Sequence, residues 1–335
     1  MKKLENGTIP VSSIVRFQKV NPGAQILIDD GRVSLKVLEH ITDQTLVCEA
    51  LEDGAIENGK GVNFPEIALD VPVLTDQDEK DLLLSLQKEA DWIALSFVRS
   101  PSDYSLISSK IKEAGYKTPV MAKIEKWEAV QNLNSIIESF DAVMVARGDL
   151  GVELPVSKVP LVQMEVVEKA HQLGKPVVIA TQILDSMIDR PVPTRAEVSD
   201  IANSILDGAD ALMVTGETAI GNHPKKVIRV LRRVIKETES AINYQRNIEM
   251  PTTKTTNTAM AISQAACSVA THQSIDVLVT MTHSGSTALM AARYRSAARI
   301  VAMTPSKKIC RQLSIVWGVS PILFDEYESA DEIPV

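Results

Sequence analysis

From residue 75 onward, the chain alternates short, almost wholly apolar runs with longer segments in which apolar residues recur at helical spacing. Five apolar runs cover residues 92–97, 119–123, 142–146, 176–180 and 211–214. Strands that are apolar on both faces and are separated by helices are typical of a parallel sheet covered by helices. Five such units predict either most of a (β/α)8 barrel or a doubly wound sheet.

Two of the predicted helices begin with a capping box, in which a hydroxyl residue is followed by an acidic residue three positions later. Thr75 and Asp78 form one such pair before a helix predicted over residues 79–90. Thr194 and Glu197 form the other, and the helix that follows them is expected to stop at Gly208, because glycine is the preferred residue just beyond a helix end.

A β-rich region precedes these units. The runs at 25–28 and 33–37 surround an Asp-Gly sequence, which predicts a tight β-hairpin because glycine adopts positive φ at little cost. Residues 45–50 continue as a third strand. We therefore expect a small β domain over residues 1–70.

A second region of alternation follows a long helical pattern at 227–242. The pattern predicts helix, strand, helix and strand over residues 258–272, 276–281, 286–294 and 300–302. We expect the barrel-like units to fill residues 71–245, and a smaller α/β domain to fill residues 246–335.

Charge and cysteine content narrow the class of protein. The formal net charge of −8 argues against a nucleic-acid or anionic-membrane partner, because both need a basic surface. No apolar run approaches the roughly 20 residues that span a bilayer, and the start of the chain lacks the apolar stretch of a signal peptide. Cys48, Cys267 and Cys310 form no CxxC motif, so we expect reduced thiols in a cytoplasmic protein.

Polar residues gather where the predicted parallel strands end. They are Ser96, Lys123, Glu125, Arg147, Asp149, Thr181, Thr215 and Glu217. Taken singly, such residues are more often solvated charges, helix-start carboxylates or N-caps than catalysts. In a parallel barrel, however, the carboxyl ends of the strands carry the active site, so these side chains are expected to converge there.

The convergent group favours phosphoryl or enolate chemistry. Glu125 and Asp149 suit Mg²⁺ or Mn²⁺, which prefer oxygen ligands, and the absence of histidine or cysteine clusters disfavours zinc. Lys123 beside the metal would neutralise a transferring phosphoryl group or a developing enolate. The turn at 148–151 can aim backbone amides at an anion, such as a substrate carboxylate.

Five segments resemble the pyruvate kinase family, in the family's order. They are Gly61–Pro65, Lys123–Glu125, Met144–Glu153, Ala180–Met187 with Pro193–Asp200, and Gly216–Ala219. Smaller departures from the family's pattern are Lys126 and Trp127 after Glu125, and Thr215 where a serine is usual. The resemblance implies phosphoryl transfer from phosphoenolpyruvate to ADP, giving pyruvate and ATP in glycolysis.

The resemblance also assigns residue roles. Glu125 and Asp149 would hold Mg²⁺ or Mn²⁺, and Lys123 would stabilise the transferring phosphoryl group. The amides of Gly148 and Asp149 would receive the substrate carboxylate, and Thr181 would lie beside the enolate that is protonated. Two further residues would support the site: Ser96 and Arg147.

The family's fold implies a partial (β/α)8 TIM barrel, with a β-rich lid-domain remnant at the N-terminus and a partial α/β C-terminal domain. The first three barrel strands, which carry the family's K⁺ ligands and a phosphoryl-binding arginine, have no counterpart in this sequence. The chain is therefore expected to be truncated at both ends. We expect it to form a homo-oligomer or to need a complementing N-terminal fragment.

The third region holds one further motif. Residues 282–288 resemble a loop that binds a phosphorylated effector in some family members, which implies roles for Thr282, Ser284, Gly285, Ser286 and Thr287. Its partner loop has no counterpart in the sequence.

Two other functions remain open from the sequence. The chain would be an inactive pyruvate kinase remnant or one half of a split enzyme if the missing strands are essential. It would be a metal-dependent lyase acting on pyruvate enolates if the chain shared only the Glu and Asp metal ligands with pyruvate kinases. Lyase barrels of that kind also bind their metal through a Glu and an Asp.

Overall fold

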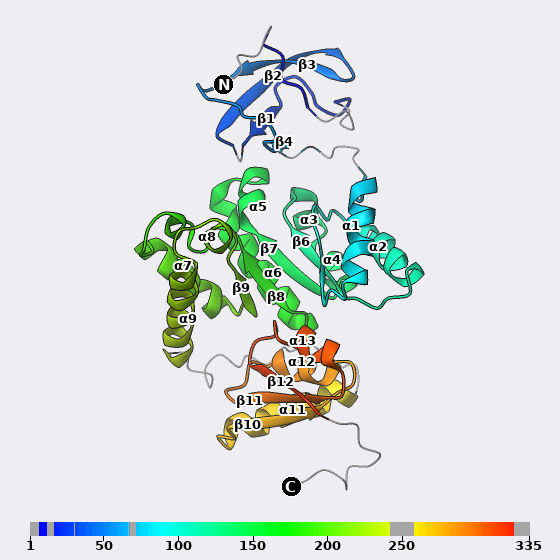
Figure 1. Ribbon diagram of the computed structural model, residues 1–335, viewed down its shortest axis with the longest axis vertical. Helices are drawn as coiled ribbons and strands as arrows, with labels where there is room; N and C mark the ends of the chain where they lie inside the picture. Colours follow the sequence, from blue (N-terminus) through cyan, green and yellow to red (C-terminus); the bar gives the residue numbers. More distant parts are fainter. Residues whose placement is uncertain are drawn as a thin grey trace.

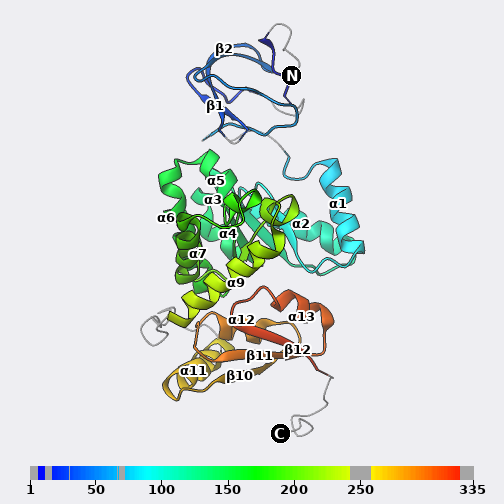
Figure 2. The ribbon, with the colours of Figure 1, turned by 60° about the vertical axis from the view of Figure 1, so that its left-hand side comes forward.

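The computed structural model describes residues 7–11, 17–29, 31–65, 67, 72–241 and 258–324. They form three sheets, and Figures 1 and 2 show the three units stacked along the long axis of the molecule, with the five-stranded sheet in the middle. Both predicted domain boundaries, at 70/71 and at 245/246, lie outside the described residues.

The N-terminal unit is a four-stranded antiparallel sheet with the strand order β3-β2-β1-β4. Its strands are β1 (Gln25–Ile28), β2 (Val33–Thr42), β3 (Thr45–Ala50) and β4 (Val62–Asn63). The predicted hairpin is confirmed, because Ile28 pairs with Val33 across its turn. Phe17 and Phe64 fill the small core with ring centroids 5.7 Å apart.

The middle unit is the wall of a (β/α) barrel. Its strands are β5 (Ile93–Leu95), β6 (Val120–Ile124), β7 (Ala142–Ala146), β8 (Val177–Ala180) and β9 (Ala211–Met213). They are parallel and neighbour one another in chain order. A doubly wound sheet would reverse its strand order at a switch point, so the barrel is the correct choice of the two predicted folds.

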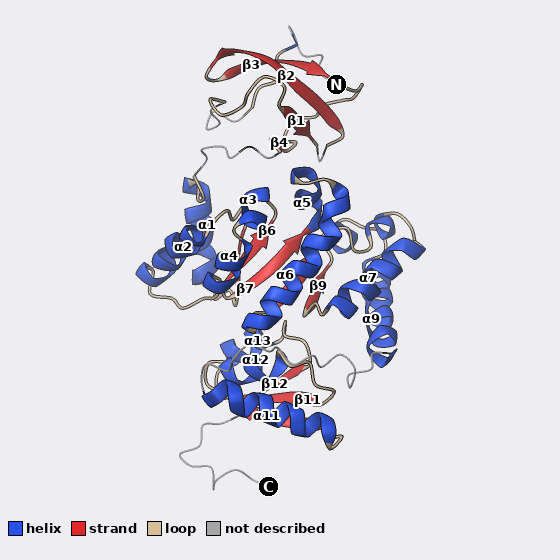
Figure 3. Cartoon of the chain, turned by 180° about the vertical axis from the view of Figure 1, so that it is seen from behind, coloured by secondary structure: helices blue, strands red, loops and turns tan. Residues whose placement is uncertain are grey.

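Helices cover the outer face of this wall, as the view from behind shows (Figure 3). The longer ones are α1 (Asp76–Gln87), α2 (Pro101–Glu113), α6 (Val159–Leu173), α7 (Arg195–Asp207) and α9 (Pro224–Ala241). The shorter ones are α3 (Trp127–Gln131), α4 (Leu133–Ser139), α5 (Arg147–Glu153) and α8 (Gly216–Ala219). Among the described residues, no helix has the length and apolar character needed to cross a membrane.

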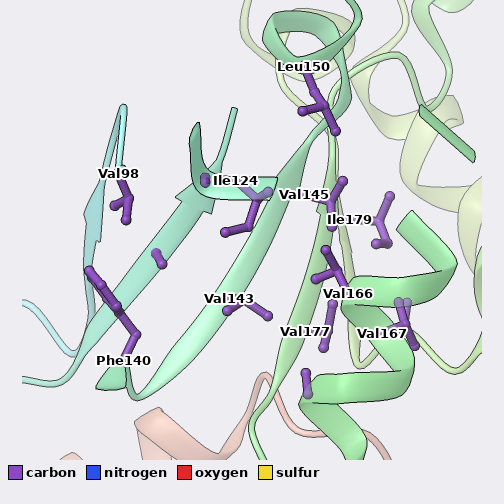
Figure 4. Close-up of a cluster of buried hydrophobic side chains, with 14 of the residues drawn as sticks. Val98, Ile124, Phe140, Val143, Val145, Leu150, Val166, Val167, Val177 and Ile179 are labelled. Atoms are coloured by element: carbon purple, nitrogen blue, oxygen red, sulfur yellow. The ribbon is translucent and has the colours of Figure 1, made fainter. Parts of the chain in front are cut away.

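Side-chain alternation along each strand divides the core in two. Outward residues such as Val143, Val145 and Ile179 pack beneath the helices in the main cluster (Figure 4). Inward residues, including Met121 and Met144, form a separate cluster on the inner face. Because β6, β7 and β8 are buried on both faces, their sequences are almost continuously apolar.

Both predicted capping boxes are present, with one correction. The Thr75 hydroxyl accepts the Asp78 amide and the Asp78 carboxylate accepts the Thr75 amide, so the helix begins at Asp76. The expected start at Glu79 is wrong, because a capping box places its acidic member inside the first turn. At the other box, helix α7 ends at Gly208, whose φ of 104° is the left-handed conformation that glycine accepts.

The third unit is a parallel sheet with the order β10-β11-β12. It comprises α11 (Thr258–His272), β10 (Val277–Met281), α12 (Ser286–Ala292), β11 (Arg299–Thr304), α13 (Lys307–Leu313) and β12 (Val319–Leu323). Helix α13 and strand β12 were not predicted. Pro321 interrupts the strand pattern of β12 and is tolerated because β12 is an edge strand of the described sheet.

Arg295 joins the third unit to the lower end of the barrel wall. Its Nη2 lies 2.7 Å from His171 Nε2, donates to Gly208 O at 2.6 Å and lies 3.0 Å from Asp210 Oδ1. Its guanidinium also stacks 4.8 Å from the centre of the Trp317 ring. Burial, reinforced by the nearby Arg295 charge, lowers the pKa of His171 to about 3.

This junction predicts a specific pH dependence of stability. The side chain of an unfolded histidine has a pKa near 6.5. In the folded protein the pKa of His171 is about 3, so the side chain stays neutral over most of this pH range. Between these values the unfolded state binds one more proton, so the free energy of unfolding falls as the pH falls, by up to about 1.4 kcal/mol per pH unit.

We expect His171→Gln to reduce the slope of the free energy of unfolding against pH by the contribution of about one proton. Urea unfolding at pH 7, 6, 5 and 4 measures this slope. The matched control is His272→Gln at an exposed position, which should keep the wild-type slope. An unchanged slope in His171→Gln would contradict the assignment.

Candidate active site

The polar cluster lies at the carboxyl end of the barrel wall, on the side that faces the N-terminal sheet (Figure 1). Lys123 is two residues after Met121, so strand alternation places it on the inner face of the barrel. Glu125 follows at the end of β6. Asp149 lies in the first turn of α5, directly after β7, and Thr181 directly follows β8.

Lys123 is held between two oxygen atoms. Its Nζ donates to Ser96 Oγ at 2.9 Å and lies 2.5 Å from Glu125 Oε1. Glu125 Oε2 accepts the backbone amide of Phe97 at 2.8 Å. The predicted residues Ser96, Lys123 and Glu125 therefore form one contiguous group across β5 and β6.

Glu125 is almost fully buried, with 1% of its surface exposed. Burial raises the pKa of its carboxyl group above the ordinary range, the Lys123 charge opposes that shift, and the Asp149 charge adds to it. The two carboxylates are thus close enough to repel each other. A divalent cation between them would relieve that repulsion.

The donor set fits a hard cation. Within the described ranges, Lys123 is the side chain in contact with Glu125 Oε1, and no hydrogen bond or ion pair reaches the Asp149 carboxylate, so oxygen lone pairs remain on both side chains for a metal ion. No group of three or more His, Cys, Asp or Glu placed to hold a metal occurs in the same ranges. Two carboxylates without further protein ligands suit Mg²⁺ or Mn²⁺, which keep bound water and take substrate oxygens.

Arg147 is buried and is not directed at open space. Its Nη1 donates to both carboxylate oxygens of Asp200, at 2.7 and 2.6 Å, and its Nη2 donates to Thr181 O at 2.9 Å and Gln182 O at 3.0 Å. Thr181 and Gln182 have φ of 66° and 52°, a left-handed pair that costs energy in non-glycine residues. The guanidinium compensates by satisfying both of their carbonyl groups.

Thr181 is fixed on its other side by Gly148. The Gly148 amide donates to Thr181 Oγ1 at 2.7 Å, and this hydroxyl donates to Ala180 O at 2.6 Å. A Cβ atom at position 148 would lie 3.4 Å from Thr181 Oγ1, so the backbone of Gly148 packs closely against this side chain. In this structure the Gly148 amide, expected to receive a substrate carboxylate, is engaged by Thr181.

Thr215 and Glu217 have a different surrounding. Glu217 is fully buried, and its carboxylate accepts the amides of Leu184 and Thr215 at 2.9 and 2.7 Å. These bonds fasten the loop after β8 to the loop after β9. Glu217 therefore supports the walls of the site.

The predicted effector loop is remote from this cluster, at the start of α12 in the third unit (Figure 1). Gly285 has a φ of 86° and its amide donates to Thr282 Oγ1 at 2.9 Å. Ser284 Oγ donates to Ser286 Oγ at 3.0 Å, and Thr287 is exposed. The effector role of these residues stays a prediction.

Two acids of this region have no role in the predictions from sequence: the part-exposed Asp200 and the buried Glu153. A signal existed for Asp200, because a buried arginine directly after an apolar strand favours an anionic partner. Glu153 ends the motif at 144–153 and is 1% exposed, but its partners come from distant segments.

Comparisons with known proteins identify the family that the chain matches. A family model described as "Pyruvate kinase, barrel domain" matches residues 2–228, and one described as "Pyruvate kinase, alpha/beta domain" matches residues 260–334. The chain is 41% identical over 319 residues to a pyruvate kinase of Clostridium acetobutylicum, covering 95% of this chain and 67% of the relative. It is 42% identical to pyruvate kinase 2 of a Synechocystis species, covering 94% of this chain and 53% of the relative.

A solved structure gives the same result. The crystal structure of a pyruvate kinase from Cryptosporidium parvum superposes with a TM-score of 0.89 at 36% identity, covering 93% of this chain and 66% of that one. The chain thus spans about half to two thirds of the length of these relatives.

The hydrogen bonds from Arg147 to Asp200, Thr181 and Gln182, here called the Arg147 clamp, should contribute to stability. Arg147→Met leaves the Thr181 and Gln182 carbonyl groups and the part-exposed Asp200 carboxylate without their donor, so the free energy of unfolding should fall by about 2 kcal/mol. Urea unfolding measures it. The matched control is Lys169→Met, whose partner Glu165 is an exposed neighbour on α6, and its expected effect is about 0.5 kcal/mol or less. Equal effects in the two variants would contradict the clamp.

Proposed function

The chain belongs to the pyruvate kinase family, and we propose that it carries out the phosphoryl transfer from phosphoenolpyruvate to ADP that yields pyruvate and ATP in glycolysis. The observation that carries the proposal is the cluster of Lys123, Glu125, Asp149 and Thr181 at the carboxyl end of the barrel wall. Phosphoryl transfer depends mostly on positioning and charge stabilisation, which a rigid cluster of this kind supplies.

Glu125 and Asp149 would hold Mg²⁺ or Mn²⁺. When bound, the cation supplies positive charge to the substrate oxygens and to the phosphoryl group in transfer. Among the described residues, Glu125 has Lys123 as its cationic partner, whereas Asp149 has none within ion-pair distance. The unbalanced Asp149 charge supports a cation site at this point. Among the described residues we assign no ligands to the K⁺ ion that the family uses.

Lys123 would stabilise charge on the transferring phosphoryl group. Its ammonium group is fixed by Ser96 and Glu125, so it needs no reorganisation when the charge develops. Bringing the substrate into contact with Lys123 would exchange one of these oxygen partners for a phosphoryl oxygen.

Thr181 would lie beside the enolate as it is protonated. Its hydroxyl is oriented by the Gly148 amide and the Ala180 carbonyl, and its backbone by Arg147. Arg147 itself would act through Thr181, because its donors are occupied by Asp200 and the two carbonyl groups.

We propose a cytoplasmic location and an oligomeric or complemented state. The three cysteines are free, and burial raises the pKa of Cys267 to about 11, which keeps this thiol protonated and unreactive. Strands β5 and β9 each have one edge without a neighbouring strand in the described sheet. A second copy or a complementing N-terminal fragment would cover such edges.

The activity test is pyruvate formation by the purified chain from phosphoenolpyruvate and ADP, with Mg²⁺ and K⁺ present. We expect Lys123→Met to lower the rate by at least about 100-fold, because it removes a preorganised charge. Lys169→Met, at a half-buried lysine paired with exposed Glu165 on α6, is the matched control and should retain the wild-type rate.

Three other outcomes would redirect the proposal. A folded wild-type chain without activity would indicate an inactive remnant, or one half of a split enzyme if adding a second chain restores it. Cleavage of a 2-keto acid without ADP would indicate a metal-dependent lyase.

The metal assignment has its own test. Glu125→Gln and Asp149→Asn should each weaken Mn²⁺ binding by about 100-fold, because each removes a charged ligand. Electron paramagnetic resonance of free Mn²⁺ measures the dissociation constant without any turnover. Glu165→Gln, on the exposed face of α6, should bind as the wild type does.

A further inference from the structure

Lys126 directly follows Glu125 and is one of the positions at which the sequence departs from the family's pattern. Its Nζ donates to Glu153 Oε1 at 2.5 Å. Glu153 is the last residue of α5, the short helix whose first turn holds Asp149. The ion pair therefore joins the two separate chain segments that carry the proposed metal ligands.

This pair is buried and has few other partners. The Glu153 side chain is 0% exposed and that of Lys126 is 18% exposed. Glu153 Oε1 also accepts Asn63 Nδ2, from β4 of the N-terminal sheet, at 3.2 Å. Glu153 Oε2 has no hydrogen-bond partner in the part of the chain that the structure describes. Removing a carboxylate from water is costly unless it is paired or hydrogen-bonded, and the Lys126 ammonium is the cation in contact with Glu153.

The backbone makes the connection stiff. Lys126 is the N-cap of α3, and its carbonyl accepts the amides of Ala129 and Val130 at 3.1 and 3.3 Å. Glu125 precedes it on a buried strand end and is itself held by Phe97. A shift of the Lys126 side chain would therefore be transmitted to the adjoining carboxylate ligand.

We propose that Lys126 and Glu153 are a positioning pair that sets the separation of Glu125 and Asp149 for a divalent cation. The inference rests on the proposed function and deepens it, by assigning to this pair the geometry of the metal site. Figure 1 shows the arrangement: α3 and α5 lie next to each other at the end of the barrel wall, below β4.

The direction in which the Mn²⁺ dissociation constant changes distinguishes a positioning role of Lys126 from a purely electrostatic effect of its charge. Lys126 adds positive charge near a cation site, so its removal by itself would tighten metal binding. Loss of a residue that orients metal ligands weakens binding instead, typically by 10- to 100-fold. The two roles thus predict opposite changes in the Mn²⁺ dissociation constant.

The experiment is Mn²⁺ titration of the full chain, followed by electron paramagnetic resonance of the free ion. We expect Lys126→Met to raise the dissociation constant by about 10-fold or more. Lys126→Arg keeps the cation and should remain within about threefold of the wild type. The matched control, Lys169→Met, removes a lysine that is also 2.5 Å from a glutamate, but this glutamate, Glu165, is exposed on α6 and lies outside the two segments that carry the proposed ligands, and the variant should bind as the wild type does.

Each outcome decides the inference. Unchanged or tighter binding by Lys126→Met overturns it. If Lys126→Met does not fold, as judged by circular dichroism, the uncharged double variant Lys126→Met with Glu153→Gln takes its place. Binding several-fold weaker than wild type supports the inference and wild-type binding overturns it. A wild-type chain that binds no Mn²⁺ contradicts the proposed metal site itself, and the inference falls with it.

Discussion

The whole arrangement depends on parallel strands that are buried on both faces. Strands β6, β7 and β8 pack outward against the helices and inward against the barrel's own interior, so Lys123, near the end of β6, is the one polar residue that they contain. Polar residues are therefore displaced to the strand ends. Parallel strands end on the same side, and this is why Lys123, Asp149 and Thr181 meet.

At that end of the barrel, charge is balanced pair by pair. The pairs are Lys123 with Glu125, Arg147 with Asp200, and Lys126 with Glu153. In each pair the contact offsets the cost of removing charge from water, whereas the fully buried Glu217 is held by two backbone amides instead. Asp149 has no such partner among the described residues, so the surplus charge lies where a divalent cation is proposed.

Strain and support occur together at Thr181 and Gln182. Two consecutive left-handed residues would be unfavourable in an isolated loop, and Arg147 stabilises them because it lies at the end of the neighbouring strand. The residues at 147–149 thus have a double role. They contribute a proposed metal ligand and also fix the loop that carries the proposed hydroxyl.

Much of the fold could be predicted from local patterns. The hairpin around Ile28 and Val33, the capping box at Thr194 and the helix stop at Gly208 depend on neighbours in sequence, and all are found. Strand β12 was missed because Pro321 disguises it. The choice between barrel and doubly wound sheet was also open, because strand order depends on contacts between units and not on any one unit.

By itself, the sequence determined the alternation of strands and helices, the family resemblance and the set of polar residues at the strand ends. Only the tertiary structure decided how these residues are paired. Arg147 meets Asp200 from 53 positions away, and Lys126 meets Glu153 from 27. Such pairs produce no periodic pattern in a sequence. A buried charge requires a partner of opposite charge, but this requirement does not determine where in the chain the partner lies.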